Sequence, residues 1–276
     1  MIMQFSDTIA YIMWDISPVI INLGVLQIRW YGLMFVFTFF FGYLIIKQMF
    51  RLEAKDQTRL DNIALWIMIA AIVGGRLGHT LFYEPEHYLR YPLQILMIWQ
   101  GGMASHGAVV SIPLVLWWLA RKEKMSFWWL GDRLSIPAAL GSFFIRVGNL
   151  MNSEIIGKPT ELPWGFVFVR HDDIPRHPAQ LYEAVAYLLI FIFLYLTYRR
   201  KKSNTPTGYL FGMFLILVFG ARILIEFLKE PQVAFEQYMA LNMGQLLSLP
   251  LVVAGIILVW RSKRAAKVNS GQGEAA

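Results

Sequence analysis

Several ionisable side chains lie within apolar stretches of the sequence, and all of them fall near the same end of successive hydrophobic segments. They are Arg76, His79, His106, Arg146, Glu183, Arg222 and Glu226. A charge at the centre of a bilayer costs roughly 2.5 to 3.5 kcal/mol even on the most lenient scale, so such residues usually serve a function. We therefore interpret them as the basis of a functional site.

Two arginines carry the clearest chemical signal. Arg146 and Asn149 stand one helical turn apart and share a helix face, as do Arg222 and Glu226 at i and i+4. A guanidinium matches phosphate geometrically and keeps its charge, so two arginines that reach one cavity favour an anion, which in a bilayer would be a lipid phosphate. Alternatively the arginines are only structural, with Arg222 paired to Glu226 and Arg146 to Glu154.

His106 is a candidate general base. Gly101, Gly102 and Gly107 lie close to it in sequence, and glycines let backbone or ligand approach closely. An imidazole with a pKa near 6.5 can take a proton from a thiol or a hydroxyl at neutral pH. The alternative is a hydrogen-bonded packing residue.

Other polar residues allow weaker interpretations. Tyr31 is an interfacial aromatic residue that could also donate a hydrogen bond to a substrate in the same cavity. Gln180 and Glu183, about one turn apart at the start of another predicted helix, would support the site or pack. His171 and His177 lack the recurring spacing of metal ligands, so we predict no metal site.

Composition identifies the class of protein. The 276 residues are 57% hydrophobic with a mean hydropathy of +0.50, which indicates an all-α polytopic membrane protein. The absence of cysteine excludes disulfides and a cysteine nucleophile, so any thiol in the chemistry must come from a substrate. The net charge of +7 comes from short clusters between apolar segments, which favours membrane sidedness over nucleic-acid binding.

The hydropathy pattern predicts about seven transmembrane helices. Basic clusters occupy alternate connections, so the positive-inside rule places the N-terminus outside and the C-terminus in the cytoplasm. With this orientation the ionisable residues face the outside. The predicted spans are 30–46, 61–82, 97–120, 134–151, 179–198, 208–228 and 243–260.

We expect a single integral membrane domain over residues 1–276. An interfacial segment at 1–29 would precede the bundle at 30–260, and 261–276 would form a polar cytoplasmic tail. The long outer connections 83–96 and 152–177 predict a small ordered cap, which could shield a site or gate entry to it.

These residues resemble the bacterial prolipoprotein diacylglyceryl transferase family over nearly the whole chain. The most specific match runs from Arg146 through Gly148-Asn149, Asn152 and Glu154 to Gly157. Collinear support comes from Trp30-Tyr31-Gly32, Gly74-Gly75-Arg76, Gly101-Gly102 with His106-Gly107, Arg176-His177-Pro178 with Gln180-Leu181-Tyr182-Glu183, Arg222 with Glu226-Phe227, and Met243-Gly244-Gln245.

The resemblance implies an enzyme of the bacterial inner membrane with its active site toward the extracytoplasmic side. Such an enzyme transfers the diacylglyceryl group of phosphatidylglycerol to the lipobox cysteine in the signal peptide of a preprolipoprotein. It forms a thioether, releases glycerol phosphate and needs no cofactor.

The resemblance also implies roles for individual residues. Arg146 and Arg222 would bind the headgroup and stabilise the departing phosphate, with His106 as a candidate base. Tyr31, Asn149, Glu154, Gly157 and Glu226 would contribute to substrate binding.

Two other functions remain open from the residues alone. A phospholipase-type enzyme could use His106 and Glu154 to activate water against a lipid headgroup. An anion or lipid transporter could use the arginines as a substrate site, although the sequence lacks the inverted repeats typical of many transporters.

Overall fold

The computed structural model describes residues 5–6, 9–24, 27–98, 102–231, 236 and 239–273. Gly101 of the predicted glycine pair lies outside these residues, as do parts of the predicted terminal segments. The chain forms two compact units, which are described separately below. Unit 1 comprises residues 1–45 and 132–276, and unit 2 comprises residues 46–131.

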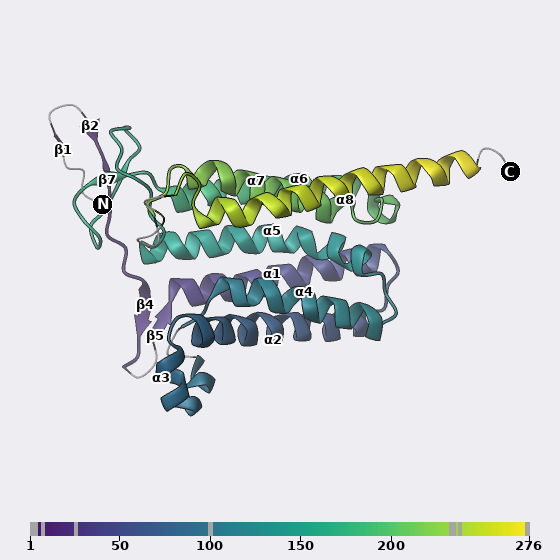
Figure 1. Ribbon diagram of the computed structural model, residues 1–276, viewed down its shortest axis with the longest axis horizontal. Coiled ribbons are helices and arrows are strands. Elements are labelled where there is room, and N and C mark those ends of the chain that lie inside the picture. Colours follow the sequence, from purple (N-terminus) through teal and green to yellow (C-terminus); the bar gives the residue numbers. More distant parts are fainter. Residues whose placement is uncertain are drawn as a thin grey trace. The chain divides into compact units, whose positions relative to one another are not determined.

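Helices occupy all seven predicted spans (Figure 1). They are α1 (Trp30–Leu52), α2 (Gln57–Phe82), α4 (Ser105–Lys122), α5 (Phe127–Asn152), α6 (Ala179–Lys201), α7 (Tyr209–Glu226) and α8 (Met243–Gly273). Within the described residues, six are long and apolar enough to cross a membrane, and the 18-residue α4 is not among them. The prediction of an all-α polytopic membrane protein is confirmed.

The helix boundaries differ from the prediction in three places. The third predicted span began at residue 97, but α4 begins at Ser105, because Gly102 has a φ of +73° that a right-handed helix does not adopt. The predicted basic loops are shorter, since α1 continues to Leu52 and α2 begins at Gln57. The predicted polar tail is helical as far as it is described, since α8 continues to Gly273.

Glycines let the helices of unit 1 approach one another closely. α7 packs against both α6 and α8, as the three adjacent ribbons in Figure 1 show. A Cβ atom on Gly255 would lie 2.7 Å from the carbonyl oxygen of Gly212, so α7 and α8 touch through their backbones here. At Gly141 of α5 an added Cβ would lie 2.6 Å from the side chain of Thr38 in α1.

A carboxylate from α5 fixes the start of α7. The Asp132 side chain is fully buried, and its oxygens accept hydrogen bonds from the backbone N–H groups of Gly208 and Phe211, at 2.6 and 2.9 Å. These donors would otherwise lack partners at the N-terminus of a helix. Asp132 therefore caps a helix that lies far from it in the sequence.

A small sheet covers the C-terminal end of α5. Its strands are β3 (Ile12–Trp14), β6 (Phe166–Phe168) and β7 (Pro175–Arg176), in the order β3-β6-β7, and β3 runs parallel to β6. Phe166 and Phe168 pack with Leu150 at the end of α5, and the indole Nε1 of Trp14 donates a hydrogen bond to the carbonyl oxygen of Leu150 at 2.9 Å. We call β3 together with residues 153–177 the head.

The remaining strands form two short antiparallel pairs before α1. They are β1 (Phe5–Ser6) with β2 (Ile9–Ala10), and β4 (Val19–Asn22) with β5 (Gln27–Arg29). The predicted interfacial segment at 1–29 thus contains strands where it is described, while its place at a membrane surface stays a prediction.

Unit 2 is built on the contact between α2 and α4. Gly74 and Gly78 on α2 face Gly107 on α4, where an added Cβ would lie 1.9 Å from the carbonyl oxygen of Gly74. Small residues four apart are the usual means of close helix packing in membranes. The connection between the helices contains α3 (Pro85–Arg90) and the 3-10 helix η1 (Pro92–Leu96). A further 3-10 turn, η3 (Lys202–Asn204), follows α6 in unit 1.

Candidate active site

Three of the predicted site residues form a hydrogen-bonded series at the end of α5. Arg146 Nη1 donates to Asn149 Oδ1 at 2.9 Å, and Asn149 Nδ2 donates to Glu154 Oε2 at 3.1 Å. The predicted shared face of Arg146 and Asn149 is therefore confirmed. The structural alternative predicted an ion pair between Arg146 and Glu154. Arg146 forms its ion pair with Glu183 instead, so the predicted partner is wrong.

Buried charges connect α5, α6 and α7. Arg146 Nε lies 2.9 Å from Glu183 Oε2, and Lys229 Nζ lies 3.0 Å from both Glu183 Oε1 and Glu226 Oε2. The Glu183 side chain is fully buried and that of Lys229 nearly so. Tyr187 also donates its hydroxyl to Glu183 Oε1, at 3.2 Å. One lysine thus joins two carboxylates that come from different helices.

Arg222 is the loosely held member of this group. Its Nε lies 3.8 Å from Glu226 Oε2, and its side chain is 35% exposed, whereas that of Lys229 is 1% exposed. In the described part of the chain Glu226 is its only ion-pair partner. The predicted Arg222–Glu226 pair is present, but it is longer and more exposed than the Lys229–Glu226 pair.

We call Arg146, Glu183, Arg222, Glu226 and Lys229 the charge cluster. It contains three cations and two carboxylates, so it carries one excess positive charge. Four of these side chains are largely buried, and Arg222, at 35% exposed, is the member that a counter-ion from outside the cluster could reach. The cluster therefore suits a ligand with a single negative charge. Such a ligand could reach the partly exposed guanidinium of Arg222.

Gly157 brings the head against the end of α7. Its N–H donates to the carbonyl oxygen of His177 at 3.0 Å, and it forms an isolated β-bridge with Lys229. A Cβ on Gly157 would lie 2.5 Å from that same carbonyl oxygen and 2.8 Å from the carbonyl oxygen of Leu228. The structure thus explains the glycine by close backbone packing beside Lys229.

The backbone around Glu154 is unusual. Ser153 and Ile155 have φ values of +54° and +58°, in a region that residues with a Cβ seldom adopt. Gln180, which is fully buried, donates its side-chain amide to the carbonyl oxygen of Glu154. Such strain is often retained at functional sites, and here it turns Glu154 back toward Asn149.

Tyr31 lies beside this group of residues. An added Cβ at Gly148 on α5 would lie 2.9 Å from the Tyr31 ring, so the first turn of α1 packs directly against the α5 segment that carries Arg146. The structure thus places Tyr31 with the α5 part of the predicted site.

His106 and Arg76 belong to unit 2. The His106 ring stacks on Tyr83, with centroids 5.5 Å apart. Arg76 is buried and donates to the backbone carbonyl oxygens of Ile95 at 2.9 Å and Gly102 at 3.2 Å, and it also lies over the ring of Tyr88. Arg76 thus holds the connection before α4. The role of His106 as a base stays a prediction.

Lys229 was missed by the sequence reasoning, and Glu183 was predicted only as a supporting or packing residue. The spacing of Lys229, three residues from Glu226, was a usable signal, because such a pair lies on one side of a helical turn. Its contact with Glu183, however, depends on the packing of α6 against α7.

A second set of charges lies in the head. Arg176 pairs with Asp172 and, at 2.6 Å, with Glu230. The hydrogen bond from Arg176 lowers the pKa of the Asp172 carboxyl, and partial burial lowers the pKa of His177. Within the described residues, no group of three histidines or acidic residues is placed to hold a metal ion.

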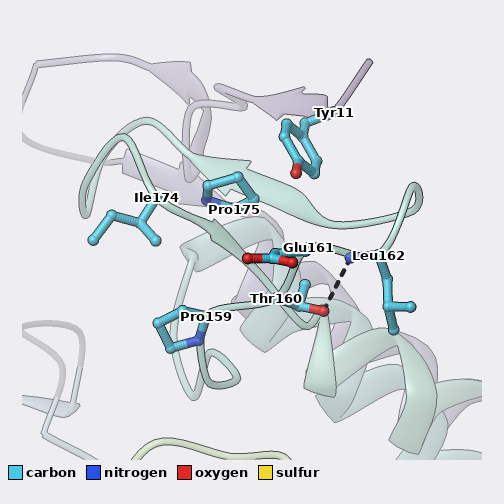
Figure 2. Close-up of a pocket in the computed structure, with 7 residues that line it drawn as sticks. All are labelled: Tyr11, Pro159, Thr160, Glu161, Leu162, Ile174 and Pro175. Atoms are coloured by element: carbon cyan, nitrogen blue, oxygen red, sulfur yellow. Dashed lines mark hydrogen bonds between the residues drawn. The ribbon is translucent and has the colours of Figure 1, made fainter. Parts of the chain in front are cut away.

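The head also contains a hollow of about 860 Å³ that none of the predicted site residues lines (Figure 2). Its lining includes Thr160 Oγ1, which accepts a hydrogen bond from the N–H of Leu162 at 3.3 Å. The lining residues are Tyr11, Pro159, Thr160, Glu161, Leu162, Ile174 and Pro175.

Comparison with known proteins agrees with the resemblance of the sequence motifs. A family model described as prolipoprotein diacylglyceryl transferase matches residues 18–261. Relatives named phosphatidylglycerol–prolipoprotein diacylglyceryl transferase include proteins from Tolumonas auensis, 48% identical over 91% of this chain and 97% of the relative, and from Chloroherpeton thalassium, 42% identical over 95% and 98%. One from Bacteroides fragilis is 39% identical over 92% and 96%. The chain therefore belongs to the prolipoprotein diacylglyceryl transferase family.

Proposed function

We propose that this protein transfers the diacylglyceryl group of phosphatidylglycerol to the lipobox cysteine in the signal peptide of a preprolipoprotein. The transfer forms a thioether and releases glycerol phosphate. The observation that carries the proposal is the charge cluster, whose excess positive charge matches the single negative charge of a phosphodiester lipid. Family membership supplies the two substrates, which are the ones in the names of the relatives.

Arg222 and Arg146 bind the phosphate in this proposal. Arg222 has its guanidinium partly exposed and only a 3.8 Å pair with Glu226, so its planar donors are available to phosphate oxygens. Arg146 is fixed by Glu183 and Asn149, and it adds positive potential in a site that excludes water. Glu154 acts on Arg146 through Asn149.

The remaining proposed residues shape the site around the phosphate. Tyr31 donates a hydrogen bond to the lipid headgroup from the first turn of α1. Glu226 orients Arg222, and Gly157 lets the head approach the end of α7 closely enough to place Lys229. No cofactor is required, because both bonds that change belong to the substrates.

The reaction is a displacement at carbon. The substrate thiolate attacks the glyceryl carbon bonded to the phosphate ester oxygen, so a C–S bond forms as the C–O bond breaks, and the bonding electrons leave with the phosphate monoester. A cysteine thiol has a pKa near 8.5 and is only a few per cent ionised at pH 7, so a base must accept its proton. His106 is the proposed acceptor.

The proposed active site faces the extracytoplasmic side of the bacterial inner membrane. Arg146 and Arg222 lie toward the C-terminal ends of α5 and α7, and Gln180 and Glu183 lie in the first turns of α6. The basic run Arg199–Lys201 ends α6 at the opposite side. The positive-inside rule puts that run in the cytoplasm, and the charge cluster is then outside.

The test is a transfer assay with purified protein in detergent. Phosphatidylglycerol and a lipobox peptide are supplied, the gain of one diacylglyceryl unit is measured by mass, and a peptide with serine in place of the cysteine is the control. Arg222→Ala should lower the rate by about 10²- to 10³-fold, as expected for removing one preorganised donor to developing charge. Arg170→Ala, an exposed arginine of the head, is the matched control and should leave the rate unchanged.

Other outcomes would refute the proposal. Lipid consumption without modification of the peptide would indicate a phospholipase. Movement of lipid or anion without chemical change would indicate a transporter. Full transfer activity in Arg222→Ala would exclude the assigned role of that arginine.

A further inference from the structure

We propose that Lys229 is a positioning residue that neutralises Glu183 and Glu226 and so leaves Arg222 available to the anionic headgroup of the lipid substrate. The inference rests on the proposed function and assigns to that site a residue that the sequence motifs did not single out.

The first observation is the geometry of Lys229. Its ammonium group lies 3.0 Å from one oxygen of Glu183 and 3.0 Å from one oxygen of Glu226, and the side chain is 1% exposed. A lysine so buried is stable as a cation only because both carboxylates accompany it. Its position is therefore specified by two helices at once, α6 through Glu183 and α7 through Glu226.

The second observation is the competition for Glu226. Lys229 and Arg222 both approach Glu226 Oε2, and the lysine takes the short contact while Arg222 remains at 3.8 Å. Since electrostatic attraction strengthens as distance falls, removal of the lysine would draw Arg222 onto the unpaired carboxylate. A guanidinium held in a close carboxylate pair has fewer donors left for a phosphate.

The third observation is the charge of the whole cluster. With Lys229 the cluster has one excess positive charge, and without it Arg146 and Arg222 would only balance Glu183 and Glu226. Attraction for a phosphodiester would then be lost even if the arginines stayed in place. Both effects predict that Lys229 acts on lipid binding and leaves the peptide substrate unaffected.

The backbone anchors this lysine to the head. Lys229 forms a β-bridge with Gly157, and Lys158 donates its N–H to the carbonyl oxygen of Leu228 at 2.8 Å. The head therefore fixes the backbone of Lys229, and the two carboxylates fix its ammonium group. A residue whose role was only to fill space would not need both the backbone bridge and the two ion pairs.

The experiment compares Lys229→Met, Lys229→Arg, Glu226→Gln and the double variant Lys229→Met/Glu226→Gln. The Michaelis constants for phosphatidylglycerol and for the lipobox peptide are measured separately. Retention of phosphatidylglycerol relative to phosphatidylcholine is measured in mixed micelles without peptide, so this readout does not depend on turnover. Lys158→Met is the matched control, because Lys158 is an exposed lysine of the head.

Lys229→Met should raise the Michaelis constant for phosphatidylglycerol by about 10- to 100-fold, the range for loss of one charge-assisted hydrogen bond, and leave that for the peptide unchanged. Lys229→Arg should restore most of the lipid affinity. The double variant should bind the lipid better than Lys229→Met alone, because removing the Glu226 charge restores the excess positive charge.

Several results would overturn the inference. They are a double variant that is worse than Lys229→Met, an equal rise in both Michaelis constants, or no rescue by arginine. If Lys229→Met does not fold, Lys229→Gln carries the test, since it removes the charge but keeps a hydrogen-bond donor, and it should lower the retention of phosphatidylglycerol. Unchanged retention would refute the inference.

The same experiment separates this inference from the proposed function. If the variants retain phosphatidylglycerol in the expected order but the unmodified protein never modifies the peptide, the transferase function is refuted and the role of Lys229 in anion binding is supported. If the unmodified protein transfers normally and Lys229→Met has an unchanged affinity for the lipid, only the role of Lys229 is refuted and the transferase function stands.

Discussion

Gly157→Ala tests whether the close approach of the head to the end of α7 places the charge cluster. An alanine Cβ here would lie 2.5 Å from the carbonyl oxygen of His177 and 2.8 Å from that of Leu228, whereas ordinary contact begins at 3.4 Å. Both neighbours are backbone atoms, so no side-chain rotation can relieve the overlap. To reach 3.4 Å, the backbone at Gly157 must move away from His177, within the head, by about 0.9 Å and from Leu228, at the end of α7, by about 0.6 Å.

The separation acts directly on Lys229. This lysine forms the β-bridge with Gly157, and its ammonium group makes the two 3.0 Å contacts that order Glu183 and Glu226. A misplacement of about 1 Å at a catalytic site can cost about 10²-fold in rate. We therefore expect Gly157→Ala to reduce the rate of diacylglyceryl transfer by about 10²-fold, and overpacking of this kind to cost about 1 to 3 kcal/mol of stability.

The assay is the initial rate of peptide modification at equal amounts of folded protein, with thermal unfolding measured in the same detergent. Gly220→Ala is the matched control, because a Cβ on Gly220 in α7 meets nothing within 4 Å, and alanine is the better helix former. It should keep full activity and equal or greater stability. An active Gly157→Ala protein with an unchanged unfolding temperature would refute the reasoning.

Three further predictions concern stability, each measured by thermal unfolding in detergent. Arg176 holds the pKa of Asp172 below its ordinary value of 3.8, so this carboxylate stabilises the fold above that value and the contribution is lost as pH falls through the lower folded-state pKa. Asp172→Asn should therefore lower the unfolding temperature at pH 7, and the difference from the unmodified protein should vanish in strong acid. An equal difference at every pH would contradict this. Asp132→Asn should cost about 1 to 3 kcal/mol, because a neutral amide cannot accept both backbone hydrogen bonds at the start of α7; no loss would exclude the capping role. Gly107→Ala should lower the unfolding temperature clearly, because its Cβ would lie 1.9 Å from the carbonyl oxygen of Gly74 and force α2 and α4 apart, and a normal unfolding temperature would contradict that packing.

The helices could be predicted from the sequence because apolar length is a local property. Each of the seven predicted spans contains a helix, and one error fell at the start of the third span, which was predicted at residue 97 whereas α4 begins at Ser105. There an apolar composition favoured a helix while the backbone at Gly102 turns left-handed. The cap of α2 by Asp56 is also local, since the acceptor and its donor Thr58 are two residues apart.

The parts of the site that span one helical turn could also be predicted. Arg146 with Asn149 and Arg222 with Glu226 follow from the 3.6-residue period, and the structure has both contacts. Lys229 could not be ranked above other basic residues, because its importance depends on the distance to Glu183 on another helix.

The strand pairs of the head could not be predicted from the sequence, because they too depend on contacts between distant segments. β3, β6 and β7 are two or three residues long, which is too short for an alternating pattern to be recognised. Their stability comes from tertiary packing, including the hydrogen bond from Trp14 to the end of α5.

The parallel pairing of β3 with β6 has a consequence for biosynthesis. Ile12 pairs with Phe166, so the first strand of this sheet is made about 150 residues before its partner. At a translation rate of roughly 5 to 20 residues per second, the wait is on the order of 10 to 30 seconds. Until then Trp14 lacks its aromatic neighbour Phe166 of β6, and closing so long a loop carries an entropic cost. The head is therefore completed only after β6 and β7 have been made, and β3 stays without its strand partner until then.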